Sequence, residues 1–283
     1  MASTRMQDIT QSQVSAFLKP RPADSHKGQF GQVAIIGGGN GMVGAALLAG
    51  RAALKLGAGS VHIGLLADNA PSVDLQQAEL MLHQVQIALQ LPKLDVIAIG
   101  CGMGHTLSAQ KILHDALKLD VSLLLDADAL NILAMRPDLR SLLVTRKSPS
   151  IITPHPGEAA RLLGISSEEV QLDRIKAALE LAKRMRCSVV LKGSNSLCVS
   201  CDGKVWRNNT GNAGMSGPGM GDVLSGMIAA LIAQGLNADQ AMLLAVHLHG
   251  AAGDALAKQQ ARIGMTATEV TEWSRWLFNQ WIK

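Results

Sequence analysis

A glycine-rich stretch at residues 211–222 carries the clearest chemical signal in this 283-residue sequence. It contains five glycines and a proline, ends at Asp222, and runs directly into the apolar segment 223–231. Such a backbone lets a ligand approach closely, and the first turn of a following helix directs free N–H groups and partial positive charge at the loop. This pattern is typical of an anion site, most often for phosphate. A carboxylate there suits a base beside a phosphoryl group; the alternative is a glycine-rich turn with Asp222 as helix cap.

A second glycine-rich stretch lies at residues 37–44. Gly39, Gly41 and Gly44 match the dinucleotide fingerprint between a predicted strand and helix, and Asp68 ends the next predicted strand. Alone, this pattern predicts an NAD-dependent oxidoreductase. However, the glycine run begins before the fingerprint, and a dehydrogenase does not explain the stretch at 211–222. We therefore interpret the first stretch as close backbone packing around a ligand. The sequence contains no P-loop motif.

Ionisable side chains follow several of the predicted strands, where ligands bind in parallel α/β sheets. Asp126 and Asp128 could orient a substrate or magnesium, although Asp128 could equally cap the next helix. His155 lies between two prolines after a strand, and Glu158 could lie near magnesium or favour a helix N-terminus. Lys192 can meet phosphate as a point charge, or be a solvated or capping lysine.

Two histidine and cysteine patterns are weaker. His247 and His249 lie two positions apart on a predicted helix and face different ways, so they are not a metal pair. Cys198 and Cys201 fall in a predicted strand, where residues three apart face opposite sides. With no second cysteine or histidine pair nearby, we do not assign them a zinc or redox role.

The composition favours one large globular domain. Hydrophobic residues make up 48% of the chain, and no change of composition marks a linker. A net charge of +4 without clustered basic and aromatic residues argues against nucleic acid as a partner. The N-terminus lacks a signal-peptide core, and the apolar stretch 223–238 is too short for a membrane span. Four cysteines form no disulfide framework, so we expect a cytoplasmic protein.

Short β-branched runs alternate with longer helical stretches. This order predicts an α/β fold with a mostly parallel central sheet and helices on both faces. The strands are expected at 32–37, 60–66, 95–100, 122–126, 150–153 and 188–192, followed by an antiparallel hairpin at 196–200 and 204–207. The helices are expected at 42–56, 73–89, 107–117, 156–163, 168–185, 223–234, 238–258 and 268–281.

The two ends of the chain carry further expectations. We expect the whole of residues 1–283 to form a single domain, with residues 1–24 as a peripheral, helical N-terminal segment. Near the other end, Trp273, Trp276, Leu277 and Trp281 form a stripe at helical spacing. This stripe is either core or a subunit interface, since an exposed tryptophan is unfavourable.

Four separated segments together resemble one known family. They are residues 41–46 with 57–59, residues 100–104 with 125–131, the Thr-Pro-His-Pro-Gly-Glu segment at 153–158, and residues 192–196 with the loop ending in Gly-Met-Gly-Asp-Val-Leu-Ser-Gly. In this order, over roughly residues 25–260, they resemble the ADP/ATP-dependent NAD(P)H-hydrate dehydratases of the ribokinase-like superfamily. The resemblance implies a ribokinase-like fold and no epimerase domain. It implies repair of NADH hydrate and NADPH hydrate by phosphorylation of the ring hydroxyl and loss of phosphate.

The resemblance also implies roles for particular residues. Asp222 matches the catalytic aspartate that takes the proton from the hydroxyl, and also a substrate-binding position. Ala45, Gly104 and His155 match the other hydrate-binding positions. The nucleotide-binding positions are matched by Lys192, Gly193, Ser194, Asn195, Ser196, Asn212, Gly214, Met215, Gly219 and Gly221. Pro218 departs from the family pattern and removes one N–H donor from the anion site.

The co-substrate implied by the resemblance is ADP or ATP with Mg²⁺, and the assembly is a homo-oligomer, commonly a tetramer. The sequence does not separate ADP from ATP, or NADH hydrate from NADPH hydrate. The main alternative is a ribokinase-like kinase that phosphorylates a small vitamin alcohol and releases the ester. A second alternative is a protein that senses ADP without turnover.

Overall fold

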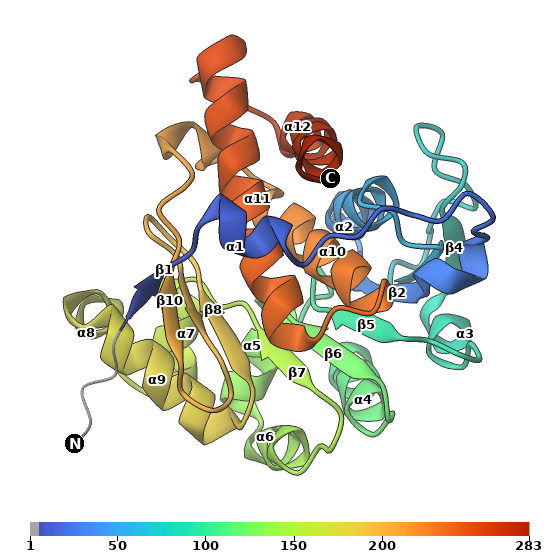
Figure 1. The fold of residues 1–283 in the computed structure, drawn as a ribbon. Helices are drawn as coiled ribbons and strands as arrows, with labels where there is room; N and C mark the ends of the chain where they lie inside the picture. Colours follow the sequence, from blue (N-terminus) through green and yellow to red (C-terminus); the bar gives the residue numbers. More distant parts are fainter. Residues whose placement is uncertain (1–5, 283) are drawn as a thin grey trace.

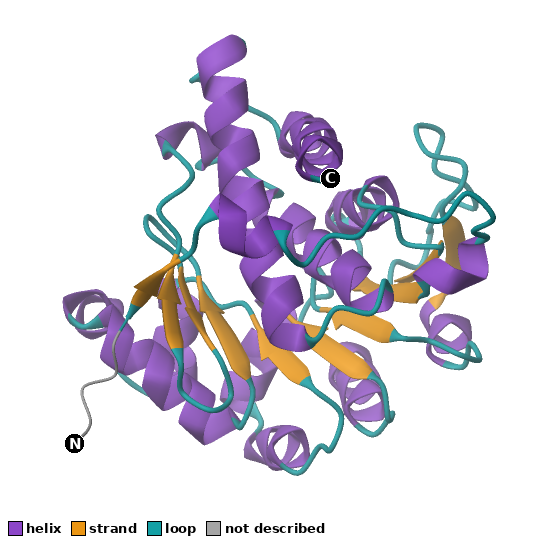
Figure 2. Cartoon of the chain, in the orientation of Figure 1, coloured by secondary structure: helices purple, strands orange, loops and turns teal. Residues whose placement is uncertain are grey.

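The computed structural model describes residues 6–282, and within them ten strands form one continuous sheet (Figures 1 and 2). The order across the sheet is β1-β10-β9-β8-β7-β6-β5-β2-β3-β4. The strands from β8 to β4 are mutually parallel, β9 is antiparallel to both neighbours, and β1 pairs in parallel with β10. The strands are β1 (Gln7–Asp8), β2 (Gln32–Gly37), β3 (Ser60–Leu65), β4 (Met81–Gln84), β5 (Val96–Ile99), β6 (Ser122–Leu125), β7 (Ser150–Ile152), β8 (Ser188–Leu191), β9 (Leu197–Val199) and β10 (Val205–Arg207).

Helices cover both faces of the sheet, as Figure 2 shows. One face is packed by α1 (Gln11–Ser15), α2 (Val43–Lys55), α10 (Met220–Ala233), α11 (Ala238–Gln259) and α12 (Ala267–Trp281). The other face is packed by α3 (Val85–Leu89), α4 (Leu107–Leu117), α5 (Ala127–Met135), α6 (Pro137–Val144), α7 (Pro156–Leu163), α8 (Ser167–Leu172) and α9 (Arg174–Met185). None of the helices in residues 6–282 combines the length and the apolar character that crossing a membrane requires.

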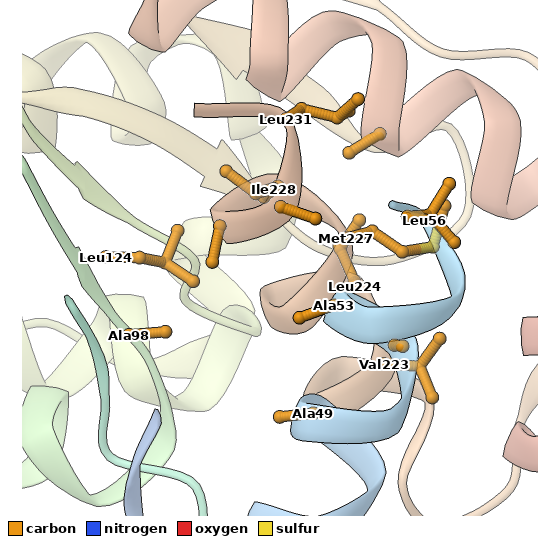
Figure 3. Packing of buried hydrophobic residues seen from close by; sticks show 14 of the residues in the cluster. Ala49, Ala53, Leu56, Ala98, Leu124, Val223, Leu224, Met227, Ile228 and Leu231 are labelled. Carbon is orange, nitrogen blue, oxygen red and sulfur yellow. The ribbon is translucent and has the colours of Figure 1, made fainter. Parts of the chain in front are cut away.

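The core has two halves because side chains alternate along each strand. In β2, Val33 and Ile35 join the cluster beneath α2 and α10, whereas Ala34 and Ile36 join the cluster on the opposite face. Figure 3 shows how α10 lies in the first cluster, with Val223 and Met227 close to the alanines of α2. Small side chains on α2 let the two helices approach closely. This packing fixes the start of α10 near the carboxyl ends of the parallel strands.

The predicted fold class is confirmed, and so are the hairpin and most of the element positions. The helix expected at 73–89 is wrong. The Asp74 carboxylate accepts two hydrogen bonds from Arg51, both at 2.7 Å, and one from the backbone N–H of Gln76. These contacts hold residues 74–80 in turns before β4 and the short α3.

Three further differences concern the number and position of the helices. Asp173 accepts a hydrogen bond from the Lys176 N–H and starts a new helix, so the helix expected at 168–185 is two helices, α8 and α9. Helix α6 was not expected, although Pro137 at its first position is a known start signal. The segment expected to be helical at 1–24 contains α1 but also β1, which extends the sheet, and residues 1–5 lie outside the described part of the chain.

The tryptophan stripe divides between core and surface. Trp281 is 7% exposed and packs against His247, with 5.8 Å between ring centroids. Trp276 is 52% exposed and contacts Trp273 edge to face. Trp273 and Leu277 are partly buried against the core cluster, so core packing accounts for every member of the stripe except Trp276.

Candidate active site

The candidate site lies at the carboxyl ends of the parallel strands, where the chain reverses its direction of travel across the sheet. From β2 the chain continues to β3 and β4 on one side, and β5 then pairs with the other side of β2. Ligands bind at such switch points in α/β sheets. The loops that follow β2, β5, β6, β7 and β8 all open at this edge, and α10 begins there (Figure 1).

Helix α10 begins at Met220, three residues earlier than expected. Gly219 precedes it with φ of 83°, a left-handed conformation that favours glycine. Asp222 is the third residue of the first turn, and no side chain caps this N-terminus among the described residues. The interpretation of Asp222 as a helix cap is therefore wrong. The first turn of α10 therefore contains both N–H groups without a partner inside the helix and the Asp222 carboxylate.

The carboxyl group of Asp222 has an unusually high pKa, raised from 3.8 to about 6. Burial is the largest cause, because it disfavours the charged form, and the negative charges of Asp126 and Asp128 add to it. A hydrogen bond with the Cys101 thiol and the positive charge of Lys192 oppose the rise. Such a carboxyl group can release and accept a proton near neutral pH.

A buried ion pair lies next to Asp222. Asp126 is 2% exposed, and its Oδ1 lies 2.6 Å from the Nζ of Lys192. The same carboxylate accepts hydrogen bonds from the Ala127 N–H and, at 2.8 Å, from the Ser225 hydroxyl of α10. Asp126 caps α5, so the proposal of Asp128 as that cap is wrong. Ala127 has φ of 46°, a strained conformation of the kind that clusters at functional sites.

His155 and Glu158 form a reciprocal cap at the start of α7. The Nδ1 of His155 accepts from the N–H groups of Gly157 and Glu158, and a Glu158 carboxylate oxygen accepts from the His155 N–H at 2.8 Å. Burial, together with the positive charges of Lys192 and Arg161, lowers the pKa of His155. The ring is therefore neutral near pH 7 and carries its proton on Nε2, which lies 3.4 Å from Oε1 of Glu158. Glu158 Oε2 also lies 4.0 Å from Lys192 Nζ, and burial raises the pKa of this acid.

Asp128 organises the loop after β5. One of its oxygens accepts from the Gly104 N–H at 2.9 Å, and the other lies 2.9 Å from Nε2 of His105. Ala45, at the start of α2, lies against this same loop, because a Cβ added to Gly102 would be 3.2 Å from that of Ala45. The structure thus gathers Ala45 and Gly104 around one loop, with Asp128 linking that loop to the start of α5.

A cavity of about 470 Å³ adjoins the start of α10. Most of the residues expected to bind nucleotide line it, including Lys192, Gly193, Ser194, Asn195, Ser196, Asn212, Met215 and Gly221. Gly214 and Gly219 flank the cavity without lining it, and Ala45, Gly104 and His155 lie outside it. A larger hollow of about 630 Å³, lined by residues 144–150, 186–188, 201 and 237–239, contains none of the expected site residues.

Sequence reasoning missed the residues that support this cavity. Arg174 donates to the carbonyl groups of Leu191, Lys192 and Ser194 and so fixes the strand end and the loop. Asp254 accepts from the Gly211 N–H at 2.8 Å and from the Asn212 side chain at 3.0 Å. Both supports lie far along the chain from what they hold, and only the folded topology brings them together.

The first glycine stretch makes the packing contacts expected of it. The N–H groups of Gly38 and Gly39 donate to the carbonyl groups of Cys101 and Gly102. Asp68, the acid of the dinucleotide pattern, is hydrogen bonded to Asn40 through both its backbone and its side chain. This arrangement does not favour the oxidoreductase interpretation.

The acids of the site provide few free ligands for a metal. Among residues 6–282, no group of three or more His, Cys, Asp or Glu side chains is arranged to hold a metal ion. Asp126 and Glu158 share Lys192, and Glu158 also binds the His155 N–H. Magnesium is commonly held by one or two carboxylates together with nucleotide phosphates. The side chains fit magnesium in that form, bound together with a nucleotide.

The fold and the site define a ribokinase-like enzyme, with a carboxyl group of raised pKa at the start of a helix beside a nucleotide-sized cavity. The family model described as NAD(P)H-hydrate dehydratase matches residues 33–275. The chain belongs to the NAD(P)H-hydrate dehydratase family, as the sequence resemblance predicted.

Individual relatives agree with this assignment. The chain is 41% identical over 267 residues to the ADP-dependent (S)-NAD(P)H-hydrate dehydratase of Neisseria meningitidis, covering 93% of this chain and 90% of that protein. It is 40% identical over 270 residues to the bifunctional NAD(P)H-hydrate repair enzyme Nnr of Escherichia coli, covering 94% of this chain but 51% of that protein, or about half its length. The structure of the ADP/ATP-dependent NAD(P)H-hydrate dehydratase from Bacillus subtilis, co-crystallised with ATP/Mg²⁺, aligns with a TM-score of 0.85 at 30% identity, covering 99% of this chain and all of that one.

Proposed function

We propose that the protein converts the (S)-forms of NADH hydrate and NADPH hydrate back to NADH and NADPH, with ADP as the phosphoryl donor. The observation that carries the proposal is the position of Asp222. Its carboxyl group, with a pKa of about 6, lies in the first turn of α10, next to Gly221 of the cavity lining, and is hydrogen bonded to Cys101 in the loop after β5 that also contains Gly104. The names of the relatives from Neisseria meningitidis and Bacillus subtilis support the same substrate and co-substrate.

The proposed reaction has two steps. Asp222 takes the proton from the ring hydroxyl, whose oxygen attacks the terminal phosphorus of ADP while the bond to the bridging oxygen breaks and AMP leaves. The carbon–oxygen bond then breaks, phosphate leaves with the electron pair, and loss of a proton from the neighbouring ring carbon restores the double bond. The N–H groups at the start of α10 and the ammonium of Lys192 stabilise the transferring phosphoryl group.

The substrate and nucleotide roles of the individual residues are part of the proposal. Ala45, Gly104 and His155 would contact the hydrate, with the neutral His155 ring donating from Nε2. Residues 192–196, Asn212, Gly214, Met215, Gly219 and Gly221 would hold the nucleotide. Magnesium, bound with the nucleotide near Asp126 and Glu158, would neutralise phosphate charge.

We extend the proposal to the molecule's organisation and location. The two core clusters meet on a single continuous sheet, which supports one domain over the whole chain. The half-exposed Trp276 supports a homo-oligomer, proposed to be a tetramer. All four cysteines are free, which supports a reducing compartment, proposed to be the cytoplasm.

A repair assay tests the function. Prepared NADH hydrate and NADPH hydrate are incubated with ADP or ATP and magnesium, and the absorbance of the restored cofactor is followed from pH 4.5 to 8. We expect restoration with ADP, and a rate that falls as the pH drops below about 6, because a protonated Asp222 cannot act as a base. No restoration with either nucleotide would refute the proposal and favour a kinase of small alcohols.

A further inference from the structure

One buried side chain beside the nucleotide-sized cavity has no partner. His249 of α11 is 9% exposed, and its Nε2 lacks any hydrogen-bond partner in the described part of the chain. The neighbouring buried histidine on the same helix is different, since Nδ1 of His247 lies 3.1 Å from the Asn208 side-chain oxygen. A buried polar atom without a partner is unfavourable by about 1–3 kcal/mol and requires an explanation.

The surroundings of His249 belong to the cavity. His249 and Gly250 line it together with Val246 of the same helix and Leu224 of α10. The absence of a side chain at Gly250 lets α11 approach the opposite wall, because an added Cβ would be 2.3 Å from the hydroxyl of Thr210. One turn further on, Asp254 holds Gly211 and Asn212, which line the same cavity. Helix α11 is thus the back wall of the cavity.

The chemistry of His249 suits a neutral hydrogen-bonding group. Burial, with a contribution from the positive charge of Lys192, lowers the pKa of the ring to about 4. At neutral pH it therefore carries one N–H donor and one acceptor nitrogen. The apolar Val246 and Leu224 beside it offer a surface to a flat base, and the ring itself offers a polar contact.

We propose that His249 is a binding residue for the adenine nucleotide and forms a hydrogen bond to it inside this cavity. This inference rests on the proposed use of a nucleotide by the enzyme. Nε2 of His249 then has a hydrogen-bond partner, because the bound co-substrate supplies the polar group that residues 6–282 do not. His249 contributes to nucleotide affinity and not to the binding of the hydrate.

Calorimetric titration with ADP, in the absence of hydrate, tests the inference on the full chain. His249→Leu removes the hydrogen-bonding group, and His249→Gln keeps a donor and an acceptor. We expect His249→Leu to weaken ADP binding about tenfold, the equivalent of one hydrogen bond, and His249→Gln to retain affinity close to that of the wild type. The melting temperature of nucleotide-free His249→Leu should be equal to or above that of the wild type, since the variant removes an unsatisfied group.

Ser274→Ala provides the matched control. Ser274 is also buried, and its hydroxyl has no partner among residues 6–282, but it lies on α12 and does not line the cavity. This variant should bind ADP like the wild type.

Other outcomes separate the two proposals. Wild-type affinity in His249→Leu, with ADP binding intact in the wild type, would overturn the role of His249 alone. Equal losses in both His249 variants with lowered melting temperatures would overturn it in favour of a structural role. A wild-type protein that binds neither ADP nor ATP would overturn both the inference and the proposed function.

Discussion

The substitution Asp222→Asn should make the protein more stable while abolishing turnover. In the folded protein the pKa of Asp222 is about 6, against an ordinary value of 3.8. The ionised form of Asp222 therefore lowers the free energy of unfolding. At 1.36 kcal/mol for each pKa unit, this difference corresponds to about 3 kcal/mol as an upper limit. The carboxylate is partly accessible to solvent, and it loses its contact with the Cys101 thiol on substitution, so we expect a gain of about 1–3 kcal/mol at pH 8.

The pH dependence of this gain identifies its cause. Well below pH 3.8 the acid is protonated in both the folded and the unfolded protein, and the neutral asparagine offers no advantage. As the pH rises from 4 towards 6, the unfolded chain binds fewer protons than the folded one, so the wild type loses stability relative to the variant. Above about pH 7 the difference should be constant.

Urea unfolding of both proteins at pH 4.5, 5.5, 6.5 and 8 measures this difference. Asp138→Asn is the control, because the Asp138 carboxyl has its pKa lowered by Arg136 and should show no gain at high pH. Our reasoning about Asp222 is refuted if Asp222→Asn is no more stable than the wild type at pH 8, or if its advantage is the same at every pH.

Two further substitutions test the support of the site and the assembly. Ser225→Ala removes the hydroxyl that donates to Asp126, so it should destabilise the protein by about 1–3 kcal/mol in urea and slow hydrate repair. Wild-type values for both would show that Lys192 and the Ala127 N–H hold Asp126 without this hydroxyl. Trp276→Ser should leave the folded subunit's secondary structure intact by circular dichroism but reduce the sedimenting mass, because the exposed indole is expected at a subunit contact. An unchanged mass would remove this face of α12 from the interface.

Local sequence patterns predicted the sheet and the glycine loops because each depends on near neighbours. The strand at 188–192 and the helix after Gly219 follow from β-branched runs and from glycine followed by an apolar segment. The errors have long-range causes. The segment 74–80 is diverted by Arg51, more than twenty residues away, and no local pattern shows that contact.

The same limit applies to the site. Strand ends indicated Asp126 and Lys192 separately, but their ion pair depends on β6 and β8 lying on either side of β7. The sequence does not identify Ser225 as a site residue, because a serine within an apolar helix is common. Its hydroxyl reaches Asp126 only because α10 packs against the sheet. His249 gave a similarly weak signal, because a lone histidine on a buried helix carries no indication of its missing partner.

The network around Asp222 links nucleotide binding to the strength of the base. Lys192 lowers the pKa of Asp222, and Asp126 raises it. In the proposed reaction, a phosphate group at the start of α10 would add negative charge beside Asp222 and compete with Asp126 for Lys192, and both effects would raise that pKa, whereas magnesium bound with the nucleotide would lower it. The pH profile of hydrate repair at saturating ADP and magnesium should therefore report the balance of these charges, and a midpoint above 6 would show that the phosphate outweighs the magnesium.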